Sequence, residues 1–157
     1  MYTLTLVLLL FVFPAISISV DFFSPDNGSD LLFLIGKWFS FWAIGVRLTA
    51  AGIRQILNPE FTAGEIFGLQ EKGAQKIVQE LGFGNCSLGL LGLLSLCEPG
   101  WILPSAIAGG IFYGLAGMKH LITAHRNANQ TAAMLSDLFV FLVMAVFVAA
   151  TFRRFWI

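Results

Sequence analysis

Charged residues are scarce in this chain: they make up 11% of its 157 residues, against 57% hydrophobic residues. A soluble domain of this size needs far more polar side chains on its surface, so a water-soluble globular protein is excluded. There is also no excess of positive charge, because nine Lys and Arg residues balance nine Asp and Glu residues. With no basic patch to neutralise phosphates, we expect no nucleic acid partner.

Cysteine and histidine are equally sparse. Cys86 and Cys97 fall in one apolar run, where a helix separates them by about 16 Å, beyond the reach of a disulfide. The two histidines, His120 and His125, point to different faces of a helix, which argues against a zinc site or a haem. No phosphate loop, nucleophile elbow or zinc-protease motif occurs. We therefore expect no metal and no cofactor, and we do not predict an enzyme.

Long apolar runs dominate the sequence instead. Each contains about the number of residues, roughly 20, that an α-helix needs to cross the hydrocarbon core. The runs cover residues 2–20, 31–57, 77–97, 101–123 and 132–152. The sequence thus predicts an all-α bundle of five spans in a lipid bilayer, with 1–157 as a single transmembrane domain. A cleaved signal peptide would leave four spans, but the first run has no positive flank and no clear cleavage site, so we favour a retained span.

Charge at the ends of the spans predicts an orientation. With alternating spans, one side holds Arg54, Lys72, Lys76, Lys119 and Arg126. The other side holds Asp21, Asp26, Asp30 and Glu98. The positive-inside rule then places the N-terminus in the cytoplasm. Three basic residues oppose this orientation: Lys37, Arg153 and Arg154.

The segment between the second and third spans predicts an extra helix. Pro59 ends the second span, since the residue before a proline avoids the helical conformation. Thr62 and Glu65 then have the spacing of a capping box, and apolar residues recur with a helical period up to Leu81. We expect an amphipathic helix in the membrane interface, with a plain loop as the alternative.

Small residues form stripes on three of the predicted spans, where they let helix backbones approach closely. They are Gly45 and Gly52, then Gly89 and Gly92, then Ala106, Gly110 and Gly114. A bundle of five helices needs several close contacts, so we favour packing within the chain. A homo-oligomer or a larger membrane complex is the alternative.

A few polar residues inside the spans converge on one depth. Counting along each helix places them all in the leaflet on the positively charged side. They are Arg47, Glu80, Asn85, His120 and Asp137. A lone charge in hydrocarbon is costly, so Arg47 should pair with Asp137 or with Glu80. Two interpretations follow: the pair serves only to fix the bundle, or the cluster is a pocket for a small molecule, a lipid or a proton.

Three stretches carry a resemblance to known sequences. Residues 58–96, the run WILPSAIAGGIFYGLAGMKH at 101–120 and AAMLSDLFVF within 132–141 resemble an uncharacterised family of small bacterial membrane proteins. That family is similar, more loosely, to DoxX-like four-helix proteins. The residues that carry over are Glu80, Leu81, Gly82, Phe83, Asn85, His120 and Asp137. The resemblance implies a helical bundle in a bacterial inner membrane and no known activity. The thiol redox work of some DoxX-like proteins does not transfer, because paired cysteines are missing.

Two functions remain open from the sequence. The first is a structural or accessory subunit that packs through its small-residue faces. The second is a binder or transporter that uses the cytoplasmic-side polar cluster.

Overall fold

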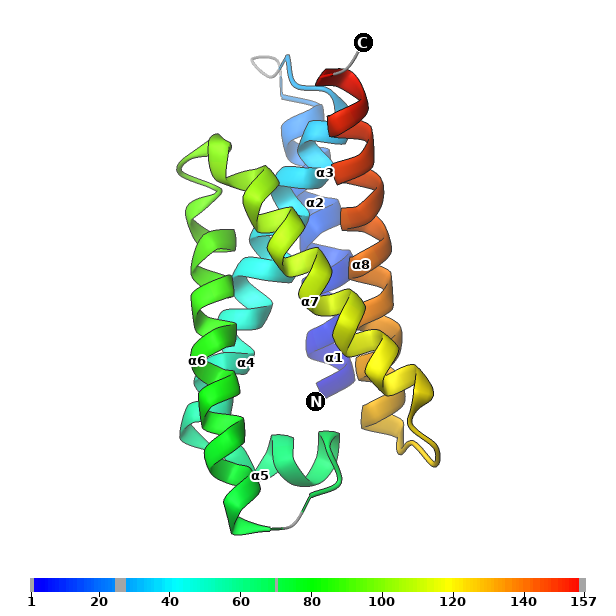
Figure 1. Cartoon of the computed structure of the whole chain (residues 1–157). Helices are drawn as coiled ribbons and strands as arrows, with labels where there is room; N and C mark the ends of the chain where they lie inside the picture. Colours follow the sequence, from blue (N-terminus) through cyan, green and yellow to red (C-terminus); the bar gives the residue numbers. More distant parts are fainter. Residues whose placement is uncertain (1, 25–27, 70, 156–157) are drawn as a thin grey trace.

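The protein is a bundle of five long helices. The computed structural model describes residues 2–24, 28–69 and 71–155, which contain helices and no strand. Five helices are long and apolar enough to cross a membrane: Tyr2–Phe22, Leu31–Leu57, Gly73–Leu94, Pro99–Ile122 and Ala128–Arg154. They alternate in direction, so the first begins at the lower end and the last finishes at the upper end (Figure 1). The all-α prediction is confirmed; Asp26 lies outside the described residues.

Two of the long helices contain a π-helical turn. The elements are α1 (Tyr2–Val7), η1 (Leu8–Val12), α2 (Phe13–Phe22), α3 (Leu31–Phe39), η2 (Ser40–Val46), α4 (Arg47–Leu57), α5 (Pro59–Phe61), η3 (Thr62–Ile66), α6 (Lys72–Leu94), η4 (Pro99–Trp101), α7 (Ile102–Ile122) and α8 (Ala128–Phe155). In the first span, η1 ends at Val12, two residues before Pro14, which has no amide to donate to the carbonyl four residues before it. The Phe13 amide bonds the Leu8 carbonyl instead, which widens the turn.

The segment after the second span is shorter than the predicted amphipathic helix. It begins at Pro59, a residue that suits the first turn because the amides there need no helical partner. Thr62 and Glu65 lie inside η3, so the expected capping box does not form. Gly68 then takes a φ of 69°, which turns the chain before α6 starts at Lys72. We call residues 59–69 the floor segment, because it crosses beneath the helices (Figure 1).

Glycines bring α6 into backbone contact with η2 and α4. The seam contains Gly45, Gly52, Gly82, Gly89 and Gly92. A methyl group on Gly45 would lie 2.7 Å from the Leu93 amide nitrogen, and one on Gly52 would lie 2.7 Å from the Gly82 carbonyl oxygen. Neither separation is tolerated in a folded protein, so these positions require glycine for close approach. The stripes of the second and third spans therefore pack within the chain.

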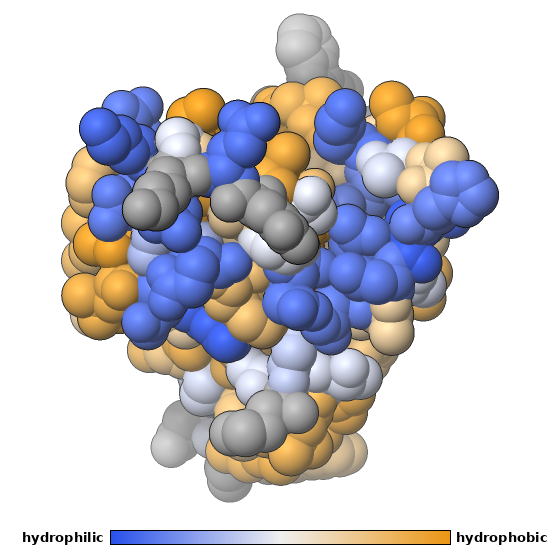
Figure 2. Space-filling view, turned by 90° about the horizontal axis from the view of Figure 1, so that it is seen from below, coloured by the Kyte–Doolittle hydropathy of each residue, from blue (hydrophilic) through white to orange (hydrophobic). Residues whose placement is uncertain are grey.

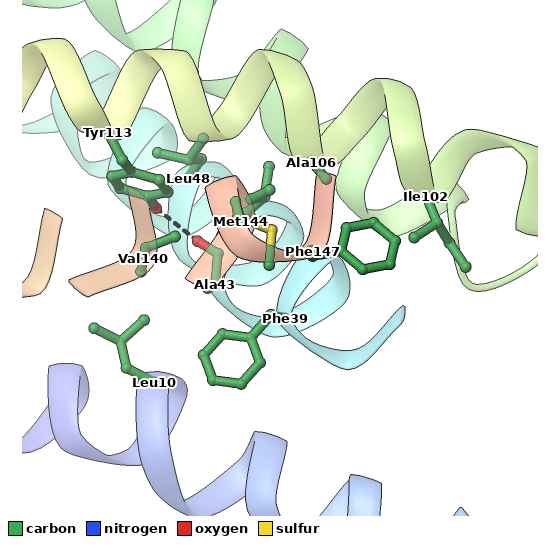
Figure 3. Close-up of a cluster of buried hydrophobic side chains, with 11 residues drawn as sticks. Leu10, Phe39, Ala43, Leu48, Ile102, Ala106, Tyr113, Val140, Met144 and Phe147 are labelled. Atoms are coloured by element: carbon green, nitrogen blue, oxygen red, sulfur yellow. Dashed lines mark hydrogen bonds between the residues drawn. The ribbon is translucent and has the colours of Figure 1, made fainter. Parts of the chain in front are cut away.

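The small residues of α7 face large side chains of α8. A methyl group on Gly110 would meet Met144, and one on Gly114 would meet Phe141. Ala106 is almost fully buried in the apolar core. This core spans α7 from Ile102 to Tyr113, and Figure 3 shows it gathered between α7, α8 and the first two spans. After Tyr113, α7 contributes no further residue to this core.

Asp30 begins the second span, and its replacement tests the upper end of the bundle. Its Oδ1 accepts from the Phe33 amide at 2.8 Å, and its other oxygen pairs with Arg154. These two donors hold the pKa of the Asp30 carboxyl below its usual range. Asp30→Ala should lower stability by about 1 kcal/mol at pH 7, as for other helix caps. Because the folded pKa is depressed, the difference from wild type should shrink as pH falls below about 4. Melting temperatures of both proteins from pH 7 to pH 3 measure this; a difference that grows in acid would contradict it.

Candidate functional site

A cavity of about 330 Å³ occupies the lower half of the bundle. All five spans and the floor segment contribute to its wall, which includes Tyr2, Arg47, Asn85, His120, Asp137 and Phe67. This volume lies within the range of small-molecule sites.

The cavity arises because the helices pack as two groups. α6 packs mainly on η2 and α4, whereas α7 packs mainly on α8. The two groups meet at the upper end, where η4 joins α6 to α7, and they diverge toward the lower end (Figure 1). Glu98 stabilises that joint by accepting from the Gly100 amide at 3.2 Å. The core fills the wedge above Tyr113, and the space below it stays open.

A buried ion pair forms one wall of the cavity. Arg47 donates from Nη2 to Asp137 Oδ1 at 2.7 Å and to Ser136 Oγ at 2.9 Å. Both charged side chains are nearly buried, with 11% and 9% exposed. The Arg47 guanidinium also lies 4.7 Å from the ring centroid of Tyr113, whose hydroxyl donates to the Ala43 carbonyl at 2.6 Å. Figure 3 shows this last bond. The pair presents no net charge to the interior.

Two polar atoms of the wall are buried without a partner. Arg47 Nη1 forms no hydrogen bond, although its other amino group forms two. Asn85 donates to Gln55 Oε1 at 2.7 Å, but its own Oδ1 accepts none. An orphaned buried polar atom costs roughly 1–3 kcal/mol, so such atoms are rare in native structures. Both residues line the cavity, although these two atoms themselves have almost no accessible surface.

The structure brings four of the five predicted cluster residues together. Arg47, Asn85, His120 and Asp137 all line the cavity, with His120 only 9% exposed. Glu80 does not join them: it is exposed on α6 and lies outside the lining. It precedes Asn85 by five residues, which rotates it by about 140° around the helix. The position of Glu80 along the helix predicted its depth in the membrane but not the face of the helix on which it lies.

The sequence analysis did not select Tyr2, Gln55 and Tyr113, which also line the cavity. The rarity of tyrosine could have drawn attention to Tyr2 and Tyr113, since the chain has only these two and both line the cavity. Gln55 follows Arg47 by eight residues, which places both on one face of the helix.

The floor segment closes the lower end and is fastened to the start of α8. Asn127 Nδ2 donates to the Glu65 carbonyl at 2.9 Å, and Gln130 Nε2 donates to the Ile66 carbonyl at 3.0 Å. Arg54 lies over the Phe61 ring, with 3.6 Å from the guanidinium carbon to the ring centroid. Hydrophilic residues gather over this end of the molecule (Figure 2).

The mouth of the cavity lies at the side of the bundle. The exposed residues of the lining belong to α1, α4 and the floor segment: Thr5, Ala50, Arg54 and Phe67. Exposure confined to these elements places the opening between them. Within the described ranges, no group of three or more His, Cys, Asp or Glu residues could hold a metal ion.

Comparison with known proteins gives a family without a known activity. A family of unknown function, DUF6790, matches residues 1–154. No curated protein and no solved structure matches the chain. The looser similarity to DoxX-like proteins and the bacterial origin stay predictions. Since the match covers nearly the whole chain, this multi-pass membrane protein belongs to the DUF6790 family.

Proposed function

We propose that this protein binds a small molecule in the cavity between its helices. The observation that carries the proposal is the cavity of about 330 Å³, whose wall includes a buried ion pair, Arg47 with Asp137, and the side chain of Asn85. A bundle that needed only a stable core would fill this space with apolar side chains. A mostly apolar cavity with a few polar side chains on its wall is the usual form of a small-molecule site.

A purely structural role explains less. A buried ion pair can fix how helices pack, but such a pair is stabilising only when its remaining hydrogen-bonding groups are satisfied. The small-residue faces that favoured an accessory subunit are used within the chain. A homo-oligomer or a larger complex therefore remains a separate proposal. Transport remains a further step beyond binding, and the sequence shows no internal repeat of the kind that many transporters contain.

We also propose that the lower end faces the cytoplasm of a bacterial cell, with the chain in the inner membrane. Basic residues at the lower end support this orientation. Two basic residues at the upper end are neutralised: Lys37 pairs with Asp21 at 2.7 Å, and Arg154 pairs with Asp30. As paired residues, they add little positive charge to the upper end and argue less against this orientation.

Filling the cavity should abolish binding. Ala116 lines the cavity, so Ala116→Leu places three additional carbon atoms in the space that a ligand would occupy. Protein purified in mild detergent from the membranes of its host would be extracted, and its bound small molecules identified by mass spectrometry. Wild type should yield one small molecule in stoichiometric amount. The Ala116→Leu protein should accumulate to the same level as wild type but contain none of this molecule.

The matched control is Ala145→Leu, at an exposed position of α8. It adds the same atoms outside the cavity, so it should retain the bound species. Equal loss in both variants, or no stoichiometric species in wild type, would reject the cavity as a binding site.

A further inference from the structure

We infer that the ligand is a lipid-soluble molecule that enters the cavity from the bilayer, through an opening between α1 and α4. The inference rests on the proposed function and deepens it, since it names the class of molecule that can reach the site. Three features carry it: the closed ends and seams around the cavity, the loose packing of α1 beside α4, and the residues at the rim of the opening.

Both ends of the cavity are closed. At the lower end, the floor segment packs inward through Thr62 and Ala63, which are buried. Its carbonyl groups accept hydrogen bonds from Asn127 and Gln130, so it is also fastened to α8. At the upper end, Tyr113 is buried and belongs to the apolar core. Among the described residues, these two ends therefore offer no entrance to a molecule dissolved in water.

Two seams between helices are closed as well. Between α4 and α6, a methyl group on Gly82 would lie 2.9 Å from the Gly52 carbonyl oxygen. Between α7 and α8, a methyl group on Gly117 would lie 2.8 Å from the Leu138 side chain. Since these seams have no room for a single methyl group, a ligand cannot pass through them.

The packing of α1 differs from that of the other helices around the cavity. It packs against α8 but not closely against α4, although both α1 and α4 line the cavity. The exposed residues of the lining lie on these two helices and on the floor segment: Thr5, Ala50, Arg54 and Phe67. This arrangement places the opening between α1 and α4, on the side of the bundle that faces lipid.

The rim of the opening changes from charged to apolar with depth. Arg54 is exposed at its lower end, where a guanidinium group suits the headgroup region. Ala50 lies about 6 Å deeper, since four residues of one helix separate the two. Behind the rim, the α1 and η1 side chains of Leu6 and Leu9 are apolar. A hydrophilic molecule would lose its hydration on this path at a high cost in free energy, whereas a lipid-soluble molecule would not.

A reporter thiol inside the cavity tests the route. Ala116→Cys places it on the cavity wall, in a protein whose own thiols are removed by Cys86→Ala and Cys97→Ala. Three methanethiosulfonates share one reactive group: the benzyl reagent is apolar, and the trimethylammonioethyl and sulfonatoethyl reagents carry opposite charges. Each is added to the protein in lipid nanodiscs, and mass spectrometry follows the modified fraction with time. Rates are divided by those of the exposed Cys97 thiol in a Cys86→Ala protein, which corrects for the reactivity of each reagent.

The benzyl reagent should have a corrected rate at least about tenfold above that of both charged reagents, because transfer of a charge into hydrocarbon is costly. A bulky side chain at the rim then tests the opening itself. Ala50→Trp, added to the reporter protein, should slow the benzyl reagent about tenfold. The matched control is Ala145→Trp, at an exposed position of α8, which should leave the rate unchanged.

The outcomes distinguish the inference from the proposed function. If the charged reagents reach the Ala116→Cys thiol as fast as the benzyl reagent, the cavity opens to water and the inference is wrong, while the proposed function stands. If Ala50→Trp slows the benzyl reagent no more than Ala145→Trp does, the opening between α1 and α4 is rejected. If no reagent modifies this thiol in the time that modifies all of Cys97, the cavity is closed and the proposed function itself fails.

Discussion

Gly89→Ala should lower the free energy of unfolding by about 3 kcal/mol, although it adds only one methyl group. That methyl would lie 2.6 Å from the Thr49 amide nitrogen and 3.0 Å from the Gly45 carbonyl oxygen. The nearest atom, Thr49 Oγ1, belongs to a side chain that can rotate, but the other two are backbone atoms, so α6 must separate from α4. Overpacking of a core typically costs 1–3 kcal/mol, and the upper end applies to a rigid neighbour. Titration with sodium dodecyl sulfate in mixed micelles, followed by circular dichroism, measures the change.

Gly84→Ala is the matched control for this prediction. Gly84 lies on the same helix, and a methyl group there meets nothing within 4 Å. It should leave stability unchanged or raise it by up to about 1 kcal/mol, the usual gain of alanine over glycine in a helix. If the two variants are equally stable, the tight seam is not formed. If Gly89→Ala instead dissociates an oligomer without loss of stability, the stripe serves an intermolecular contact.

Hydropathy and length predicted the spans because any helix that crosses a membrane must be apolar and about 20 residues long. The second run, 31–57, matches Leu31–Leu57, and the fourth, 101–123, closely matches Pro99–Ile122. The third helix starts at Lys72 rather than 77, since the polar residues that suggested a separate helix form its first turn. The π-helical turns were not predicted, although Pro14 lies close to the first of them. The hydrogen bond between the first two spans that Trp42 donates to Ser17 Oγ at 3.0 Å was not predicted either.

The sequence predicted how deep in the membrane each residue of the candidate site lies, but not on which face of its helix. Counting residues along each span placed Arg47 and Asp137 at one level, and burial of charge in hydrocarbon required Arg47 to pair with Asp137 or with Glu80. The same count admitted Glu80, because position along a helix says nothing of which face meets a neighbour. Gln55 was not selected because it is near the end of its span, where polar residues are common and do not indicate a site. Its bond to Asn85 emerges only once the glycine seam brings α4 against α6.

The largest effect of a polar substitution should come from Asp137→Leu, which we expect to lower stability by about 3–5 kcal/mol and to reduce accumulation in the membrane. The change leaves Arg47 charged and buried without a counter-ion, and removing one member of a buried pair has that magnitude. Folded protein in membranes, measured by fluorescence-detected size exclusion, gives the result. The control is Arg154→Met, which breaks the exposed pair with Asp30 and should cost at most about 1 kcal/mol.

The double variant Arg47→Met with Asp137→Leu decides what the pair is for. Apolar residues of similar volume often replace a buried ion pair without loss of stability, so this protein should accumulate nearly as well as wild type. It has lost both members of the ion pair on the cavity wall, however, and should therefore lose the bound species that wild type yields. A double variant that folds and still retains this species would show that the pair does not recognise the ligand. A double variant that fails to fold, like the single one, would show that the pair holds the bundle together, and the bound species of a folded Arg47→Lys protein would then measure recognition.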